Sequence, residues 1–165
     1  MIFEELLDVA IKAAHLSSDI ILEFSDKSKV VDYKGRTDLV TIADKKSEKL
    51  IIDTILDKFQ DHSILAEESG SNSKGSKYMW LIDPLDGTTN FVHGYPSYGI
   101  SIACSIDNII SIAVVKDIVN NDLYTAIMNK GAFKMVNQLI YQKLKLLLIL
   151  YLLLVLDITM MLIGN

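Results

Sequence analysis

Apolar residues recur at steps of three and four along the first 60 positions, which is the spacing that gathers them on one side of a helix. This pattern runs through residues 3–24 and returns from about Thr41 to Phe59. In the second segment the lysines and Glu48 fall mostly on the opposite side, which should face solvent. We therefore predict two amphipathic helices. Residues 30–37 between them are β-prone and interrupted by glycine, which predicts a loop or hairpin.

Beyond the second helix the pattern changes to short β-prone runs. Residues 62–66 and 78–82 form two such runs, and each ends directly in acidic residues. Residues 69–76 lie between them and are rich in serine and glycine, a composition typical of a surface loop. Neighbouring strands would bring the acidic residues that end the two runs to the same edge of a sheet.

Alternating apolar and small residues mark the next part of the sheet. The alternation covers residues 98–106, and the pair Asp107-Asn108 supplies a turn before the apolar run 109–115. This pattern predicts a β-hairpin, which a third strand near 123–127 extends. Two helices followed by a mostly antiparallel sheet predict an α+β fold.

Composition narrows the class of protein further. A chain of 165 residues is long enough for one domain, and its net charge of −5 with scattered lysines offers no basic face for nucleic acid. The single cysteine, Cys104, cannot form an internal disulfide, and the first residues are acidic where a signal peptide would be basic. We therefore expect a cytoplasmic protein without direct nucleic-acid binding.

The segment that carries chemistry is Asp-Pro-Leu-Asp-Gly-Thr-Thr-Asn-Phe, residues 83–91. A turn at Pro84 would bring the first and fourth Cα atoms within about 7 Å, so that Asp83 and Asp86 face one small volume. Like charges this close are unfavourable without a cation between them, and hard oxygen ligands suit Mg²⁺. Glu67 or Glu68 would add a third carboxylate, which is enough for two metal ions ~3.5 to 4 Å apart.

The residues after Asp86 suit an anion. Gly87, Thr88 and Thr89 offer backbone N–H groups and hydroxyls at what could be the start of a helix, a favourable place for phosphate. Metal ligands beside a phosphate site predict phosphoryl transfer. Asp-Pro and Asp-Gly are also common turn pairs, however, so spacing alone supports a purely structural turn equally well.

The residue identities decide between these readings. Residues 83–96 resemble the signature of the inositol monophosphatase family, which belongs to the Mg²⁺-dependent, lithium-sensitive sugar phosphatases. The segments 38–44 and 66–69 agree with the family in order and spacing, and the resemblance spans residues 6–133. It implies a layered α-β-α-β-α sandwich, of which this chain would hold the first half. It also implies a small phosphorylated polyol, such as inositol monophosphate, as substrate, and a homodimer.

The resemblance also implies roles for individual residues. Glu67, Asp83 and the backbone carbonyl of Leu85 would hold the first Mg²⁺, while Asp83 and Asp86 would contribute to the second. Asp44 and Thr88 would activate the attacking water, and Glu67 would share the role of base. The substrate phosphate would contact Asp86, Gly87, Thr88 and Thr89. For Asp44 a structural alternative stays open, because Thr41-Ile-Ala-Asp44 also fits a capping box at a helix start.

The family resemblance ends at Lys134. Residues 1–134 are therefore expected to form the inositol monophosphatase-like portion, and residues 135–165 a leucine-rich tail of another kind. One extra adenine before the codon of Met135 would restore a family-like Lys-Asn-Gly, so we hypothesise that the tail is out of frame. Its apolar run, 146–156, is shorter than the ~20 residues that span a bilayer, so membrane insertion is not expected.

A truncated chain leaves alternatives to catalysis. The family supplies a further metal-binding Asp from a Trp-Asp motif in its second half, whereas the only tryptophan here is Trp80. The first alternative is therefore a non-catalytic remnant that keeps the motif. The second is a binding protein, because bacterial relatives are reported to act through RNA-processing or transcription partners.

Overall fold

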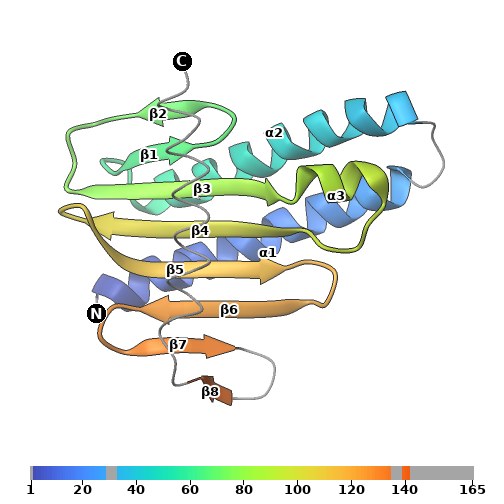
Figure 1. Cartoon of the computed structure of the whole chain (residues 1–165). Helices are drawn as coiled ribbons and strands as arrows, with labels where there is room; N and C mark the ends of the chain where they lie inside the picture. The colour runs from blue at the N-terminus through green and yellow to red at the C-terminus, as the bar shows by residue number, and fades with distance from the viewer. Residues whose placement is uncertain (1, 29–32, 135–138, 142–165) are drawn as a thin grey trace.

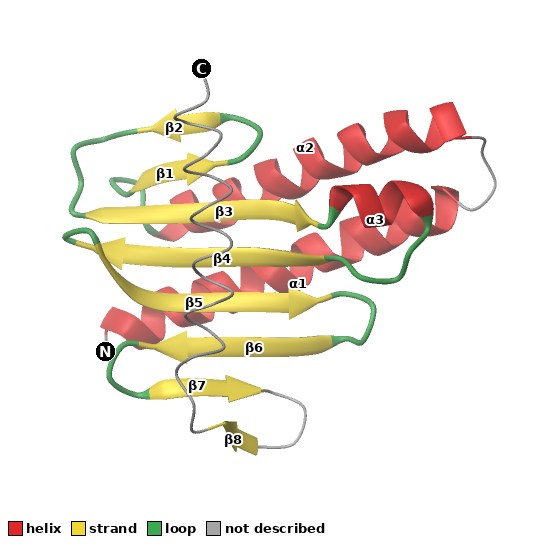
Figure 2. Ribbon diagram, viewed as in Figure 1, coloured by secondary structure: helices red, strands yellow, loops and turns green. Residues whose placement is uncertain are grey.

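Two long helices cover one face of a single sheet in the computed structural model, which describes residues 2–28, 33–134 and 139–141 (Figures 1 and 2). Helix α1 spans Ile2–Ser28 and helix α2 spans Tyr33–Lys58. Both predicted helices are confirmed. Small residues on the inner side of α1, among them Ala10, Ala13 and Ala14, are fully buried and let the helix pack closely.

Helix α2 begins earlier than the sequence pattern predicted. It starts at Tyr33, so the expected loop or hairpin is wrong for residues 33–37, and residues 29–32 lie outside the described part. Intrinsic propensity is a weak prior, and packing of a helix face usually outweighs it. Val40 and Ala43 are buried and extend the packed face towards the start of the helix. Thr41 therefore lies inside the helix, and the capping-box alternative for Asp44 is wrong.

The sheet is mixed and contains the predicted strands in sequence order along most of its width. Its eight strands are ordered β2-β1-β3-β4-β5-β6-β7-β8. They are β1 Ser63–Ala66, β2 Gly70–Asn72, β3 Tyr78–Asp86, β4 Gly99–Ile106, β5 Ile109–Asp117, β6 Asp122–Ile127, β7 Gly131–Lys134 and β8 Leu139–Tyr141. The hairpin and its third strand are confirmed as β4, β5 and β6. The predicted surface loop at 69–76 contains the short strand β2, which pairs with β1.

The core fills the space between the helices and the inner face of the sheet. Alternate residues of the central strands point to this side because side chains alternate across a strand. Those from the sheet include Trp80, Ile82, Ile100, Ile102, Cys104, Ile112 and Val114, all 1% exposed or less. Ile21 of α1 and Ile51 and Ile55 of α2 meet them from the helix layer. This packing fixes α2 above β3 and α1 above β4 and β5.

Strands β1 and β3 are parallel, whereas every other pair in the sheet is antiparallel. In this register Ala66 pairs with Ile82, and the N–H of Glu67 donates a hydrogen bond of 3.2 Å to the carbonyl of Ile82. Parallel strands end at the same edge. The residues that follow Ala66 and Ile82 are therefore neighbours, as the sequence predicted for the acidic ends of the two runs.

An aromatic cluster holds the opposite end of this parallel pair. The imidazole of His62 stacks between the rings of Phe59 and Tyr78, with centroid distances of 4.6 and 4.2 Å. The indole N–H of Trp80 donates to His62 Nδ1 over 3.0 Å. Because an indole N–H can only donate, Nδ1 must accept, and His62 is the neutral tautomer with its proton on Nε2.

Within the residues that the structure describes, no helix combines the length and the apolar character needed to cross a membrane. Apart from strand β8, the leucine-rich tail lies outside the described residues. Its proposed boundary and its proposed origin in a frameshift stay predictions.

Candidate active site

Carboxyl groups meet where β1 and β3 end. Glu67 and Asp83 share a side-chain hydrogen bond. Burial, the charge of Glu67 and the charge of Asp86 together raise the pKa of Asp83 to about 9. Burial also raises the pKa of Glu67, and the neighbouring charges of Glu68 and Asp86 add to this, while the bond from Asp83 opposes it. The raised pKa values of both groups favour a single proton shared between Asp83 and Glu67.

The chain through Asp-Pro-Leu-Asp is a strand rather than the predicted turn. Strand β3 continues to Asp86, and its pairing with β4 shifts register between Asp83 and Asp86. Pro84 has no N–H to give to a ladder, so an interrupted stretch of this kind accommodates it. Asp83 Oδ1 accepts the N–H of Leu85 over 3.1 Å, which closes the backbone locally. The two aspartates still interact, because the negative charge of Asp86 is one of the causes that raise the pKa of Asp83.

Gly87 joins this strand to a short helix, α3, Thr88–His93, which confirms the predicted helix start. Gly87 has φ 86°, and a Cβ there would lie 2.8 Å from the carbonyl oxygen of Ser97, so only glycine fits. The hydroxyl of Thr88 donates to the carbonyl of Leu85 over 2.9 Å. Thr89 is exposed at the same turn. Its carbonyl accepts a bond of 2.7 Å from His93 Nδ1, so that ring has a local structural role.

Asp44 joins the acidic group from the helix layer. Its side chain is 4% exposed, and Oδ1 has no hydrogen-bond partner among the described residues. Burial, and after it the charges of Glu68, Glu67 and Glu48 in that order, raise the pKa of Asp44 to about 7. The structure thus brings Asp44 together with the strand-end carboxylates. The single hydroxyl proton of Thr88 goes to Leu85, so its expected pairing with Asp44 stays a prediction.

Two residues at the site were not found by sequence reasoning. Ser47 Oγ donates to the carbonyl of Pro84 over 3.0 Å, and Glu48 Oε2 accepts the N–H of Glu68 over 2.7 Å. The sequence pattern placed Glu48 on the solvent side of its helix, which is wrong, because it is 3% exposed. The signal was present in the spacing: residues 44, 47, 48, 51 and 55 form one helical stripe. Its polar members were read as exposed because polar residues usually are.

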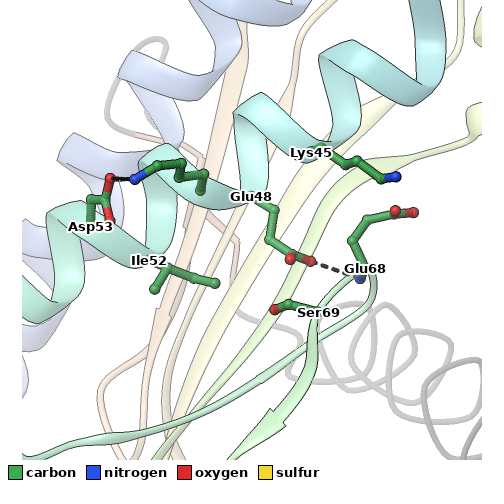
Figure 3. A pocket seen from close by; sticks show the side chains of 7 residues that line it. Lys45, Glu48, Ile52, Asp53, Glu68 and Ser69 are labelled. Carbon is green, nitrogen blue, oxygen red and sulfur yellow. Dashed lines mark hydrogen bonds and ion pairs between the residues drawn. The ribbon is translucent and has the colours of Figure 1, made fainter. Parts of the chain in front are cut away.

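A pocket opens beside Glu48, between α2 and the segment that follows β1 (Figure 3). Its wall consists of Lys45, Glu48, Lys49, Ile52, Asp53, Glu68 and Ser69. Figure 3 shows the Glu48 carboxylate pointing to the backbone of Glu68. Lys49 and Asp53 form an ion pair of 2.5 Å whose side chains are 74% and 59% exposed, so solvent screens it strongly.

The donor chemistry of the site fits a divalent cation. Glu67, Asp83 and Asp86 supply carboxylate oxygens, the ligand type that Mg²⁺ prefers, and Asp44 adds an oxygen that no described group satisfies. Among the described residues no three acidic, His or Cys side chains stand in a metal-holding arrangement, and Glu67 and Asp83 bond to each other. Burial, and to a smaller degree the neighbouring negative charges, raise the pKa values of both groups, and a bound cation would offset these effects.

The family model for the inositol monophosphatase family matches residues 3–147. The chain belongs to this family. Among curated relatives it is 40% identical over 134 residues to inositol monophosphatase 3 of Solanum lycopersicum, covering 79% of this chain and 50% of that protein. It is 39% identical over 130 residues to the Nus factor SuhB of Haemophilus influenzae, covering 77% of this chain and 49% of that protein.

Solved structures of the inositol monophosphatase family have the same fold. The inositol monophosphatase of Anabaena (Nostoc) sp. PCC 7120 superposes with a TM-score of 0.72 at 32% identity, covering 84% of this chain and 50% of that one. The extragenic suppressor protein suhB of Bartonella henselae gives 0.72 at 30% identity, covering 81% and 52%. The predicted family and α+β sandwich fold are confirmed. The chain spans about half the length of these relatives.

Proposed function

We propose that this chain carries the acidic half of the active site of a Mg²⁺-dependent phosphate monoester hydrolase. The observation that supports this most directly is the meeting of Glu67 and Asp83 at the ends of parallel strands, next to Asp44 and Asp86. Membership of the inositol monophosphatase family supports hydrolysis of inositol monophosphate or a related small phosphorylated polyol. A homodimer in the cytoplasm belongs to the same proposal, and the buried single Cys104 fits a reducing compartment.

In this proposal Glu67, Asp83, Asp86 and the carbonyl of Leu85 hold Mg²⁺. When bound, Mg²⁺ polarises the phosphoryl oxygens, acidifies a water and stabilises the leaving alkoxide. Asp44 would act as the general base, because its buried side chain lies beside the strand-end carboxylates and its Oδ1 has no hydrogen-bond partner among the described residues. Glu67 shares this role.

The phosphate would bind where β3 passes into α3. Gly87, Thr88 and Thr89 present backbone N–H groups at the first turn, and Thr89 is exposed there. Asp86 lies at the end of β3 and orients the phosphate together with the cation. The bond from Thr88 to Leu85 couples the phosphate site to a proposed metal ligand.

Phosphate release from inositol monophosphate, measured with and without Mg²⁺, tests the proposal. We expect Mg²⁺-dependent release that Asp83→Asn abolishes, because the amide removes the shared anionic ligand. Asp53→Asn is the matched control, since Asp53 is an exposed acid on α2 away from the strand ends. Calorimetric Mg²⁺ titration runs in parallel. Cation binding without any phosphate release would contradict catalysis and favour the non-catalytic remnant.

A second candidate function is a binding role in transcription. It is favoured by the similarity to proteins named Nus factor SuhB from Haemophilus influenzae and Pasteurella multocida, at 39% and 40% identity. The two functions separate in one variant. If Asp83→Asn loses phosphate release but still co-purifies with transcription or RNA-processing proteins, the binding role is supported. Loss of both phosphate release and co-purification would indicate that any partner binds through the acidic site.

A further inference from the structure

Helix α2 buries three polar side chains on the stripe that faces the strand ends: Asp44, Ser47 and Glu48. Burying such groups in a helix interface is unfavourable unless they are hydrogen-bonded. Two of the three, Ser47 and Glu48, bond to backbone atoms of the acidic segments. Packing alone therefore does not explain why these polar side chains are buried.

Glu48 holds the segment that follows β1. Its Oε2 accepts the N–H of Glu68 over 2.7 Å, while the N–H of Glu67 donates to Ile82 on β3. The backbone on either side of the Glu67 side chain is thus fixed by two different elements. A carboxylate at position 48 is electrostatically unfavourable here, because it adds negative charge beside Asp44 and Glu67.

Ser47 holds the other acidic segment. Its Oγ donates to the carbonyl of Pro84 over 3.0 Å, and Ser17 of α1 bonds to the same Oγ. Both serines are fully buried. Because the proton of Ser47 goes to Pro84, Ser17 must donate to Ser47. Pro84 lies in the stretch where the pairing of β3 with β4 shifts register. The hydrogen bonds from Ser17 to Ser47 and from Ser47 to Pro84 therefore hold the backbone at a point where regular strand pairing is interrupted.

We propose that Ser47 and Glu48 are positioning residues that hold the Glu67 and Asp83 segments at a fixed separation, so that the carboxylates converge before a cation binds. Adjacent helical residues point roughly 100° apart, so one rigid helix reaches two segments at once. This inference rests on the proposed function, because holding the carboxylates together serves catalysis only if they bind a cation. The positioning itself is a property of the metal-free chain.

Hydrogen exchange of the full metal-free chain, followed by mass spectrometry, tests the positioning. We expect Glu48→Ala to speed exchange of the 66–69 segment by about tenfold, because the part-buried amide of Glu68 loses a charged partner. Glu48→Gln keeps an acceptor oxygen and should restore slow exchange. Ser47→Ala should speed exchange around 83–87 instead. Ile55→Val, a buried change two turns along α2, is the control for general loosening.

Mn²⁺ and Mg²⁺ titrations of the same variants test the link to the metal site. Glu48→Ala and Ser47→Ala should each weaken cation binding by about tenfold, as loss of a supporting hydrogen bond does at metal sites. Glu48→Gln and Ile55→Val should bind like the parent chain. Unchanged affinity in both alanine variants would overturn the role at the metal site.

The two proposals fail in different ways. If the parent chain binds no cation but Ser47→Ala and Glu48→Ala loosen only their own segments, the metal proposal fails and the positioning stands. If both variants loosen the whole sheet as Ile55→Val does, or loosen nothing, the positioning is overturned. Should Glu48→Ala not fold, Ser47→Ala against Ile55→Val gives the same decision.

Discussion

Gly87 is a residue whose backbone geometry does not tolerate a side chain. It stands between the last residue of β3 and the first of α3, at φ 86° and against the carbonyl of Ser97. A side chain would meet two penalties, the strain of a left-handed conformation and a close approach to backbone. The link between the acidic strand end and the phosphate turn therefore depends on the absence of a side chain.

We predict that Gly87→Ala destabilises the chain more than Gly75→Ala. Gly75 also has a positive φ, 67°, but no atom lies within 4 Å of the place where its Cβ would be. Left-handed strain costs ~1 to 3 kcal/mol at either position, and the contact with Ser97 adds to it only at Gly87. Urea unfolding measures both free energies. Equal losses would show that the backbone moves away from Ser97 without cost.

The protonation state of His62 can be followed through the fluorescence of Trp80, because Trp80 is its hydrogen-bond partner and the only tryptophan in the sequence. Burial, and to a smaller degree the charge of Lys74, lower the pKa of His62 below its usual 6.5, while Asp61 opposes the shift. A folded-state pKa below the unfolded one contributes stability that is fully present above pH 6.5 and is lost as pH falls through the folded pKa. A protonated Nδ1 can no longer accept the indole N–H.

We expect the emission of Trp80 to change on acidification with a midpoint below pH 6.5. The fluorescence titration should be compared with that of His62→Gln, whose amide oxygen accepts a hydrogen bond but does not titrate. The variant should show no transition in this range. A midpoint at or above 6.5 in the parent chain would mean that burial does not govern the imidazole.

At the scale of elements, alternation and turn chemistry predicted the sheet well. Strand β4 follows from alternation and β5 from the apolar run after it, and Asp107 and Asn108 take the positive φ values, 51° and 64°, that a two-residue hairpin loop requires. Helix α2 was harder, because periodicity assigns a residue to a face by its polarity. Glu48 and Ser47 are polar but buried, and only the neighbouring backbone explains them.

The site itself was partly within reach of the sequence. The acidic ends of two runs predicted a shared edge, which the parallel pairing of β1 with β3 produces. The turn expected at Pro84 did not form, because a register shift lets β3 pass through the proline. Such a shift depends on the partner strand, which local sequence rules do not describe. Hydrogen bonds from α2 to this segment are equally non-local.

The two faces of α2 should respond very differently to substitution. Ile55→Ala removes a fully buried side chain and should cost ~2 to 5 kcal/mol of unfolding free energy. Lys49→Ala breaks an exposed ion pair within one helix and should change it by less than about 0.5 kcal/mol. Both values come from urea denaturation. A large effect of Lys49→Ala would show that the pair supports the pocket wall.

At the scale of the whole molecule, carboxyl groups are gathered at one edge of a chain whose net charge is already negative. The pKa values of Asp44 and Asp83 are raised above their usual 3.8, to about 7 and about 9. A raised carboxyl pKa contributes stability that is fully present below the unfolded value and is lost as pH rises through the folded value. Folding therefore disfavours the ionised forms of Asp44 and Asp83.

The thermal midpoint of the metal-free chain should fall as pH rises from 6.5 to 9, above the range in which His62 titrates. Mg²⁺ should raise the midpoint more at pH 8 than at pH 5, because the ionised carboxylates bind it. Circular dichroism melts with and without Mg²⁺ measure both effects. Asp83→Asn should flatten the slope, and an unchanged slope in that variant would remove Asp83 as its source.

The parallel pairing of β1 with β3 also sets an order of assembly. Strands β4 to β7 join neighbours through short turns, and such local pairs close early as a chain folds. Strand β1 meets β3 only after the segment between them has looped back along the sheet, a slower closure. We therefore expect Glu67 and Asp83 to come together late, when the surrounding strands already hold their places. Substitutions at Glu67 or Asp83 should then change the rate of unfolding more than the rate of folding.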